Sequence, residues 1–88
     1  MSLSRKHRKT LERLLEAPTR SDIWWVDIES LLLALGAEMS EGRGSRVRIY
    51  LNGVRAVFHR PHPRPITGRG AVRSVARFIV EAGVKTEG

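Results

Sequence analysis

Nine arginines, with no lysine and no acidic residue among them, lie between Gly42 and Val80. The same segment holds His59 and His62, and histidine is the side chain that exchanges protons near neutral pH. Arginine binds phosphate through two parallel hydrogen bonds and also stacks on bases. These residue types predict a surface that binds a polyanion and can move protons on it. The alternative is a basic surface that serves only solubility.

The bulk properties of the chain limit the function classes. Its 88 residues predict one domain, and 41% hydrophobic residues are enough for a folded core. The net charge of +7 favours an anionic partner, and the absence of cysteine excludes a disulfide or a thiolate metal site. No apolar run reaches the roughly 18 residues of a membrane span, and the first residues do not resemble a secretory signal. We therefore expect a cytoplasmic protein without a membrane partner.

The basic segment must be positioned by a hairpin. Asn52-Gly53 lies between two stretches in which apolar and charged residues alternate, which predicts a two-residue type I′ turn. The turn fixes the strand register, so one face carries the pairs Leu51–Val54, Ile49–Ala56 and Val47–Phe58. The other face carries the pairs Tyr50–Arg55, Arg48–Val57 and Arg46–His59. The ribbon is therefore predicted to have one apolar face and one basic face.

The remaining elements are predicted to cover the apolar face. Helices are expected over residues 4–17, 25–35 and 71–82, with a short strand over 37–41. Either Trp24 or Trp25 extends the apolar stripe of the second helix, and His7 is expected to be solvated at a basic helix start. Three prolines predict an irregular, extended connector over residues 60–70. This order predicts an α+β fold, a small antiparallel sheet with helices on one face.

Two segments resemble a known family. "DIESLLLALGAEMSEGRGSRVRIYLNGVRAVFHRPHP" and "GRGAVRSVARFIVEAGV" together are similar to the HicA family of bacterial toxins. The resemblance implies a double-stranded-RNA-binding-domain-like fold with the order α-β-β-β-α. It also implies a metal-independent ribonuclease (an mRNA interferase) and a HicB-like antitoxin that masks its RNA-binding surface. Residues 21–85 would form this HicA-like domain, and residues 1–20 a helical extension.

The sequence departs from the family at one position. The family pattern has its catalytic histidine directly after a Gly-Ser pair, whereas Arg46 follows Gly44-Ser45 here. The predicted register supplies His59, opposite Arg46, as a substitute. We expect His59 to act as the base for the ribose 2′-hydroxyl, Arg46 to stabilise charge on the phosphate, and His62, or more remotely Tyr50, to supply the acid.

No metal or other cofactor is expected, because His59 and His62 have no carboxylate or cysteine nearby and the arginines repel cations. RNA, in particular mRNA, is the expected partner besides the antitoxin. The predicted RNA-binding residues are Arg43, Gly44, Ser45, Arg48, Tyr50, Arg55, Arg60, Arg69, Arg73 and Arg77. A non-catalytic RNA-binding module on the same fold is the alternative, with Arg46 marking lost or altered chemistry.

Overall fold

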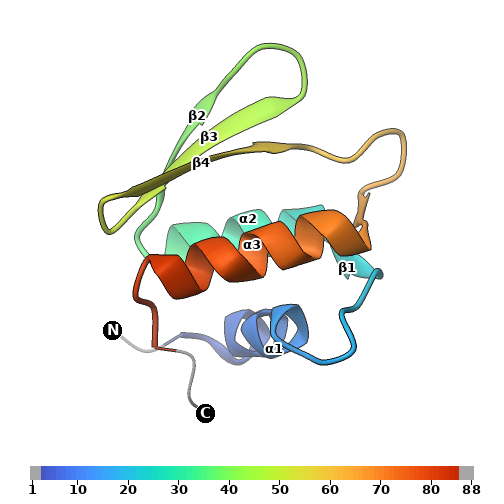
Figure 1. The fold of residues 1–88 in the computed structure, drawn as a ribbon, viewed down its shortest axis with the longest axis vertical. Coiled ribbons are helices and arrows are strands. Elements are labelled where there is room, and N and C mark those ends of the chain that lie inside the picture. Colours follow the sequence, from blue (N-terminus) through green and yellow to red (C-terminus); the bar gives the residue numbers. More distant parts are fainter. Residues whose placement is uncertain (1–2, 86–88) are drawn as a thin grey trace.

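The structure is a computed structural model that describes residues 3–85. It has three layers (Figure 1): a sheet, then two helices side by side, then a third helix behind them. The elements in chain order are α1 (Arg5–Leu14), β1 (Ile23–Trp24), α2 (Trp25–Ala34), β2 (Glu38–Glu41), β3 (Arg46–Leu51), β4 (Val54–His59), β5 (Ile66–Thr67) and α3 (Arg69–Glu81). The predicted α+β class is confirmed.

The sheet has the strand order β2-β3-β4 and is antiparallel throughout. All six predicted cross-strand pairs of the β3–β4 hairpin are present, from Leu51–Val54 to Arg46–His59. Asn52 and Gly53 have φ angles of 48° and 84°, the left-handed values that a type I′ turn requires. The Asn52 side chain also donates a hydrogen bond of 2.9 Å to the carbonyl oxygen of Ala82. The turn is thereby tied to the end of α3.

The core lies between the sheet and the helix pair. Val47, Ile49 and Leu51 of β3 are at most 2% exposed and belong to one apolar cluster with the buried residues of α2 and α3. Trp25 and Phe78 contact Phe58 of β4, with ring centroids 6.1 and 5.8 Å from its own. The structure therefore places Trp25, rather than Trp24, in the core. Trp24 is half exposed.

The helix α1 packs against the side of α2 and α3 that faces away from the sheet (Figure 1). Leu11 and Leu14 of α1 belong to the same core, and the Ser4 side chain caps the helix by accepting from the backbone N–H of His7. The ring Nε2 of His7 lies 2.8 Å from Oγ of Ser30 on α2. The expectation that His7 is solvated is therefore wrong, since its ring forms a contact between two helices.

Three local expectations need correction. The connector is not irregular throughout, because Ile66–Thr67 forms β5 and pairs antiparallel with β1. This pairing is possible because the last proline, Pro65, precedes β5, and its carbonyl oxygen accepts from the backbone N–H of Trp25 at 2.9 Å. The helix α3 begins two residues earlier than predicted, and α1 ends three residues earlier.

Among residues 3–85, no helix has the length and apolar content needed to cross a membrane.

Candidate nucleic-acid interface

The side chains that point outward from β3 and β4 form the surface that we call the arginine face. Period two places every second residue there, and the helices cover only the opposite side of the sheet. All members are exposed: Arg46, Arg48, Tyr50, Arg55, Val57 and His59. The Arg55 guanidinium lies over the Tyr50 ring, 5.4 Å from its centroid. The face thus combines cations with one aromatic ring, the two groups that bind phosphates and bases.

Arg46 and His59 form a contact at one end of this face. They are directly opposed in the hairpin, and Arg46 Nε donates a hydrogen bond of 3.3 Å to His59 Nε2. An arginine side chain can only donate, so His59 Nε2 must carry a lone pair in this arrangement. A neutral His59 ring consequently has its proton on Nδ1. The strand register alone brings together the two groups predicted to act on a phosphodiester.

Strand β2 adds polar groups that were not among the predicted site residues. Its pairing with β3 sets Glu38 opposite Tyr50 and Ser40 opposite Arg48. Both residues are exposed and line a shallow hollow across the sheet together with Arg48, Tyr50 and Arg55. The carboxylate of Glu38 therefore borders the arginine face on this side. In the sequence, polar Glu38 and Ser40 alternate with apolar Met39, which indicates that both polar residues share one face of a strand, although it does not indicate which strand lies beside them.

Arg60, which directly follows His59, is bound by two carboxylates. Its Nε donates to Glu29 of α2 at 2.7 Å, and its Nη1 and Nη2 donate to Glu41 of β2 at 2.6 and 2.9 Å. These hydrogen bonds lower the pKa of the Glu41 carboxyl and raise the pKa of Arg60. Glu29 also accepts from the indole N–H of Trp25. Two acids therefore compensate the charge of Arg60 within the fold, and its role as an RNA contact stays a prediction.

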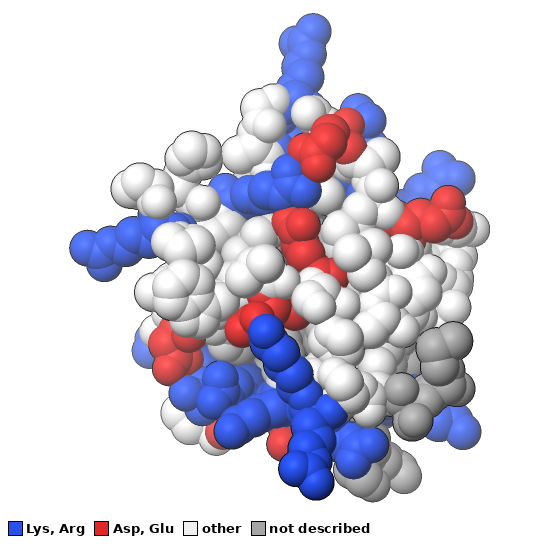
Figure 2. All heavy atoms as spheres, turned by 180° about the vertical axis from the view of Figure 1, so that it is seen from behind, with Lys and Arg blue, Asp and Glu red and all other residues white. Residues whose placement is uncertain are grey.

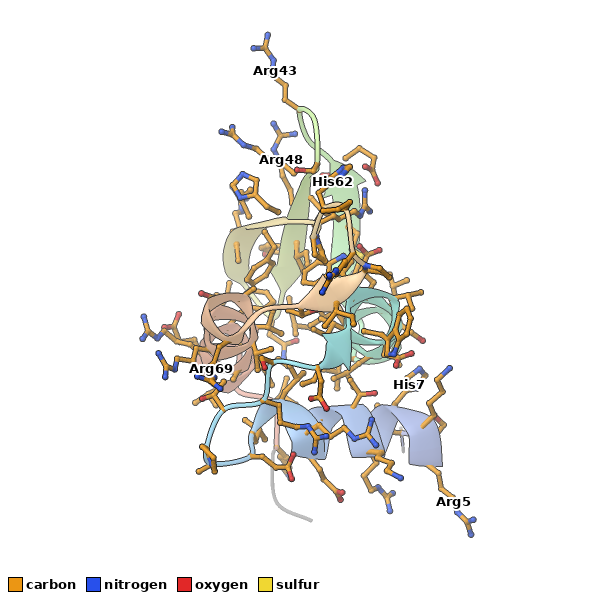
Figure 3. All side chains as sticks on the ribbon, turned by 90° about the vertical axis from the view of Figure 1, so that its right-hand side faces the viewer. Arg5, His7, Arg43, Arg48, His62 and Arg69 are labelled. Atoms are coloured by element: carbon orange, nitrogen blue, oxygen red, sulfur yellow. The ribbon has the colours of Figure 1, made fainter. Side chains whose placement is uncertain are left out.

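The loop between β2 and β3 lies next to the Arg46–His59 contact. A side chain at Gly42 would place its Cβ 3.1 Å from the Cβ of Arg46, so this close approach favours glycine. Gly44 has a φ of 59°, and the carbonyl oxygen of Ser45 accepts from the backbone N–H of Arg60 at 2.8 Å. Arg43 projects from the tip of the loop, away from the body of the molecule (Figure 3). The loop that connects β2 to β3 is thus also hydrogen-bonded to the residue that follows β4.

The three predicted arginines of α3 have different surroundings. Arg77 lines a small hollow with Arg55 and Val57 of β4, which continues the arginine face around the sheet edge. Arg73 Nε instead points to Thr19 Oγ1, at 3.4 Å. Arg69 lies at the level of the helices, whereas Arg43 and Arg48 lie at the sheet end of the molecule (Figure 3). The structure therefore brings only Arg77 next to the face.

His62 is exposed in the connector after β4. Within residues 3–85, no hydrogen bond joins its ring to His59 or Arg46. The described chain also has no group of three or more His, Asp or Glu side chains arranged to hold a metal ion. The assignments of His59, Arg46 and His62 as catalytic residues stay predictions.

Comparison with known proteins gives one match. The family model for the HicA toxin of bacterial toxin–antitoxin systems matches residues 25–84. This range contains the order α2-β2-β3-β4-β5-α3, which is the α-β-β-β-α order that the resemblance implies with the two-residue strand β5 added. No curated protein and no solved structure gives a significant match, so the double-stranded-RNA-binding-domain-like label stays a prediction. Since the matched residues make up most of the chain, the protein belongs to the HicA family of toxins from bacterial toxin–antitoxin systems.

Proposed function

We propose that this toxin is a metal-independent endoribonuclease that cleaves mRNA in the cytoplasm. The observation that carries the proposal is the Arg46–His59 contact on an open, arginine-rich sheet face. A cation and an imidazole within hydrogen-bond distance of each other can reach the same phosphodiester. Family membership supports the same conclusion.

The proposed reaction uses the ribose 2′-hydroxyl as the nucleophile. His59 removes the proton of that hydroxyl, and the 2′-oxygen attacks the adjacent phosphorus. The P–O5′ bond breaks, leaving a 2′,3′-cyclic phosphate on one product. The departing 5′-oxygen takes a proton from an acid, for which His62 and Tyr50 are the candidates. Arg46 stabilises the negative charge that builds up on the phosphate oxygens.

The hydrogen bond in the free protein suggests how substrate binding prepares the base. Without RNA, Arg46 occupies the lone pair of His59 Nε2 that must accept the proton. Both side chains are exposed, so Arg46 is free to turn toward a bound phosphate. A phosphate oxygen is a stronger partner for a guanidinium than a neutral imidazole nitrogen, because the bond joins two opposite charges. The departure of Arg46 would release the lone pair only when substrate is present.

The test is cleavage of RNA by the purified toxin in excess EDTA. We expect His59→Ala to reduce the rate by about 10²–10⁴, the usual contribution of a general base, while RNA affinity stays nearly unchanged. An RNA with one 2′-deoxy residue at the cleaved position should bind without being cut there. Equal cleavage by wild type and His59→Ala would place the base elsewhere.

The alternative, a non-catalytic RNA-binding module, is favoured by one observation, namely Arg46 in the position of the family's histidine. It predicts RNA binding by the wild type without cleavage, also after release from any bound antitoxin. The family implies a cognate antitoxin, and we propose that a HicB-like antitoxin covers the arginine face. Antitoxin and RNA should then compete for the toxin, which a displacement titration with labelled RNA would measure.

A further inference from the structure

A second group of cations lies on α1, outside the residues that the HicA family model matches. Leu11 and Leu14 face the core, so the exposed side of the first two turns carries Arg5, Lys6, Arg8 and Lys9. Lys6 approaches Asp27 of α2 at 3.6 Å. Within residues 3–85, no ion pair involves Arg5, Arg8 or Lys9. We call these three residues the α1 patch.

The cations of the α1 patch lie at the N-terminal end of α1, where positive charge is electrostatically unfavourable. The first turn of α1 contains no acidic residue, although the positive end of the helix dipole favours acids there and disfavours cations. Arg5 lies three residues from Arg8 and four from Lys9, spacings at which like charges repel on a helix surface. These repulsions destabilise α1. Glu12 lies four residues after Arg8 and three after Lys9, a favourable spacing, but within residues 3–85 it forms no ion pair with either of them. An external anion would offset them.

The α1 patch is far from the arginine face. The longest extent of the molecule, 35 Å, runs from the sheet to α1 (Figure 1). Figure 3 shows Arg5 at the opposite end from Arg43 and Arg48. Seen from behind, basic side chains gather toward both ends, and most of the acidic ones lie between them (Figure 2). One short ligand therefore cannot contact both basic regions.

We propose that the α1 patch is a second RNA-binding surface, which holds phosphates of a long RNA whose cleaved segment lies on the arginine face. This inference rests on the proposed function. The ligand is the phosphate backbone, because the patch has flexible cations and no exposed aromatic ring for stacking. Two separate contacts on one RNA strand raise the overall affinity through effective concentration. The extension before the family domain would thus favour long RNA over short fragments.

The test compares wild type with the triple variant Arg5→Gln/Arg8→Gln/Lys9→Gln. Glutamine has a helix propensity close to that of arginine and lysine, so α1 should persist, and the urea midpoint should stay equal or rise. Two RNAs are used, one just long enough for the arginine face and one several times longer. Affinity is measured against salt concentration, and the cleavage rate is measured on the short RNA as a control.

We expect the variant to lose affinity for the long RNA only. The logarithm of the binding constant falls with the logarithm of the salt concentration, with a slope of about 0.7 for each phosphate contact. Loss of three contacts should therefore lower this slope by about 2. A fourfold rise in salt should then weaken long-RNA binding by the wild type about 20 times more than binding by the variant. Binding and cleavage of the short RNA should not change. Unchanged affinity for the long RNA would overturn the inference.

An equal loss of affinity for both RNAs would also overturn it, since that result indicates an effect of net charge. A variant that keeps its affinity for long RNA but loses binding to phosphatidylserine vesicles would assign the patch to lipid instead. If the wild type binds neither RNA, the proposed function itself fails, and this inference fails with it.

Discussion

The Arg46–His59 contact predicts that the two residues can be exchanged. They are directly opposed in the hairpin, where opposite Cβ atoms lie roughly 4.5–5.5 Å apart. The double variant Arg46→His/His59→Arg would keep a guanidinium and an imidazole on the same two strands. It would also set a histidine directly after Gly44-Ser45, as in the HicA pattern that this sequence resembles.

The magnitude follows from two general costs. Loss of the base in His59→Arg should lower the cleavage rate by up to about 10⁴. In the exchanged variant the two side chains start from Cβ atoms exchanged across roughly 4.5–5.5 Å. Both can still reach one phosphodiester, so we take the remaining misplacement of the reacting groups as about 1 Å, which costs about 10². We therefore expect the exchanged variant to cleave RNA about 10²-fold more slowly than wild type and about 10²-fold faster than His59→Arg.

The assay is single-turnover cleavage of a short labelled RNA in EDTA, with urea unfolding as the control for folding. Both side chains are exposed, so the exchange should leave the unfolding midpoint nearly unchanged. If the exchanged variant is as inactive as His59→Arg while both are folded, the contact does not act as a catalytic pair. Full activity of His59→Arg would refute the role of His59 altogether.

Further predictions concern the fold, binding and pH. Ile49→Ala should lower the free energy of unfolding by about 2–5 kcal/mol in urea melts because Ile49 is buried, whereas Tyr50→Ala should cost much less, and the reverse order would contradict the register. Arg48→Ala should weaken RNA binding and lower its salt slope by about 0.7, so an affinity independent of salt would exclude a polyanion partner. The pKa of Glu41 is lowered in the folded state by Arg60, so its stabilising contribution is present above the ordinary carboxyl pKa and is lost as pH falls through the lowered value. Arg60→Ala should therefore reduce the urea midpoint at neutral pH more than at acid pH, and an equal reduction at both would show that the carboxylate bonds do not stabilise the fold.

The sequence determined the features that depend on neighbouring residues. Asn52-Gly53 sets the turn, the turn sets the register, and period two then separates Ile49 from Tyr50 onto opposite faces. The Arg46–His59 pairing could be predicted for this reason. The stripe of α2 and its glycine end were also predictable, because both depend on residues within one or two helical turns. Gly36 indeed has a φ of 98°.

Only the tertiary structure decided which distant residues meet. Nothing in the local pattern states that α2 and β2 bring Glu29 and Glu41 to Arg60. The packing of separate elements also decides that β2 pairs with β3, which sets Glu38 beside the arginine face. It likewise decides that Arg73 contacts Thr19 whereas Arg77 lies next to β4. The physical reason is that turns and periodicity act over a few residues, whereas these contacts join positions many residues apart. Such contacts form only after burial of the common apolar core has oriented the elements.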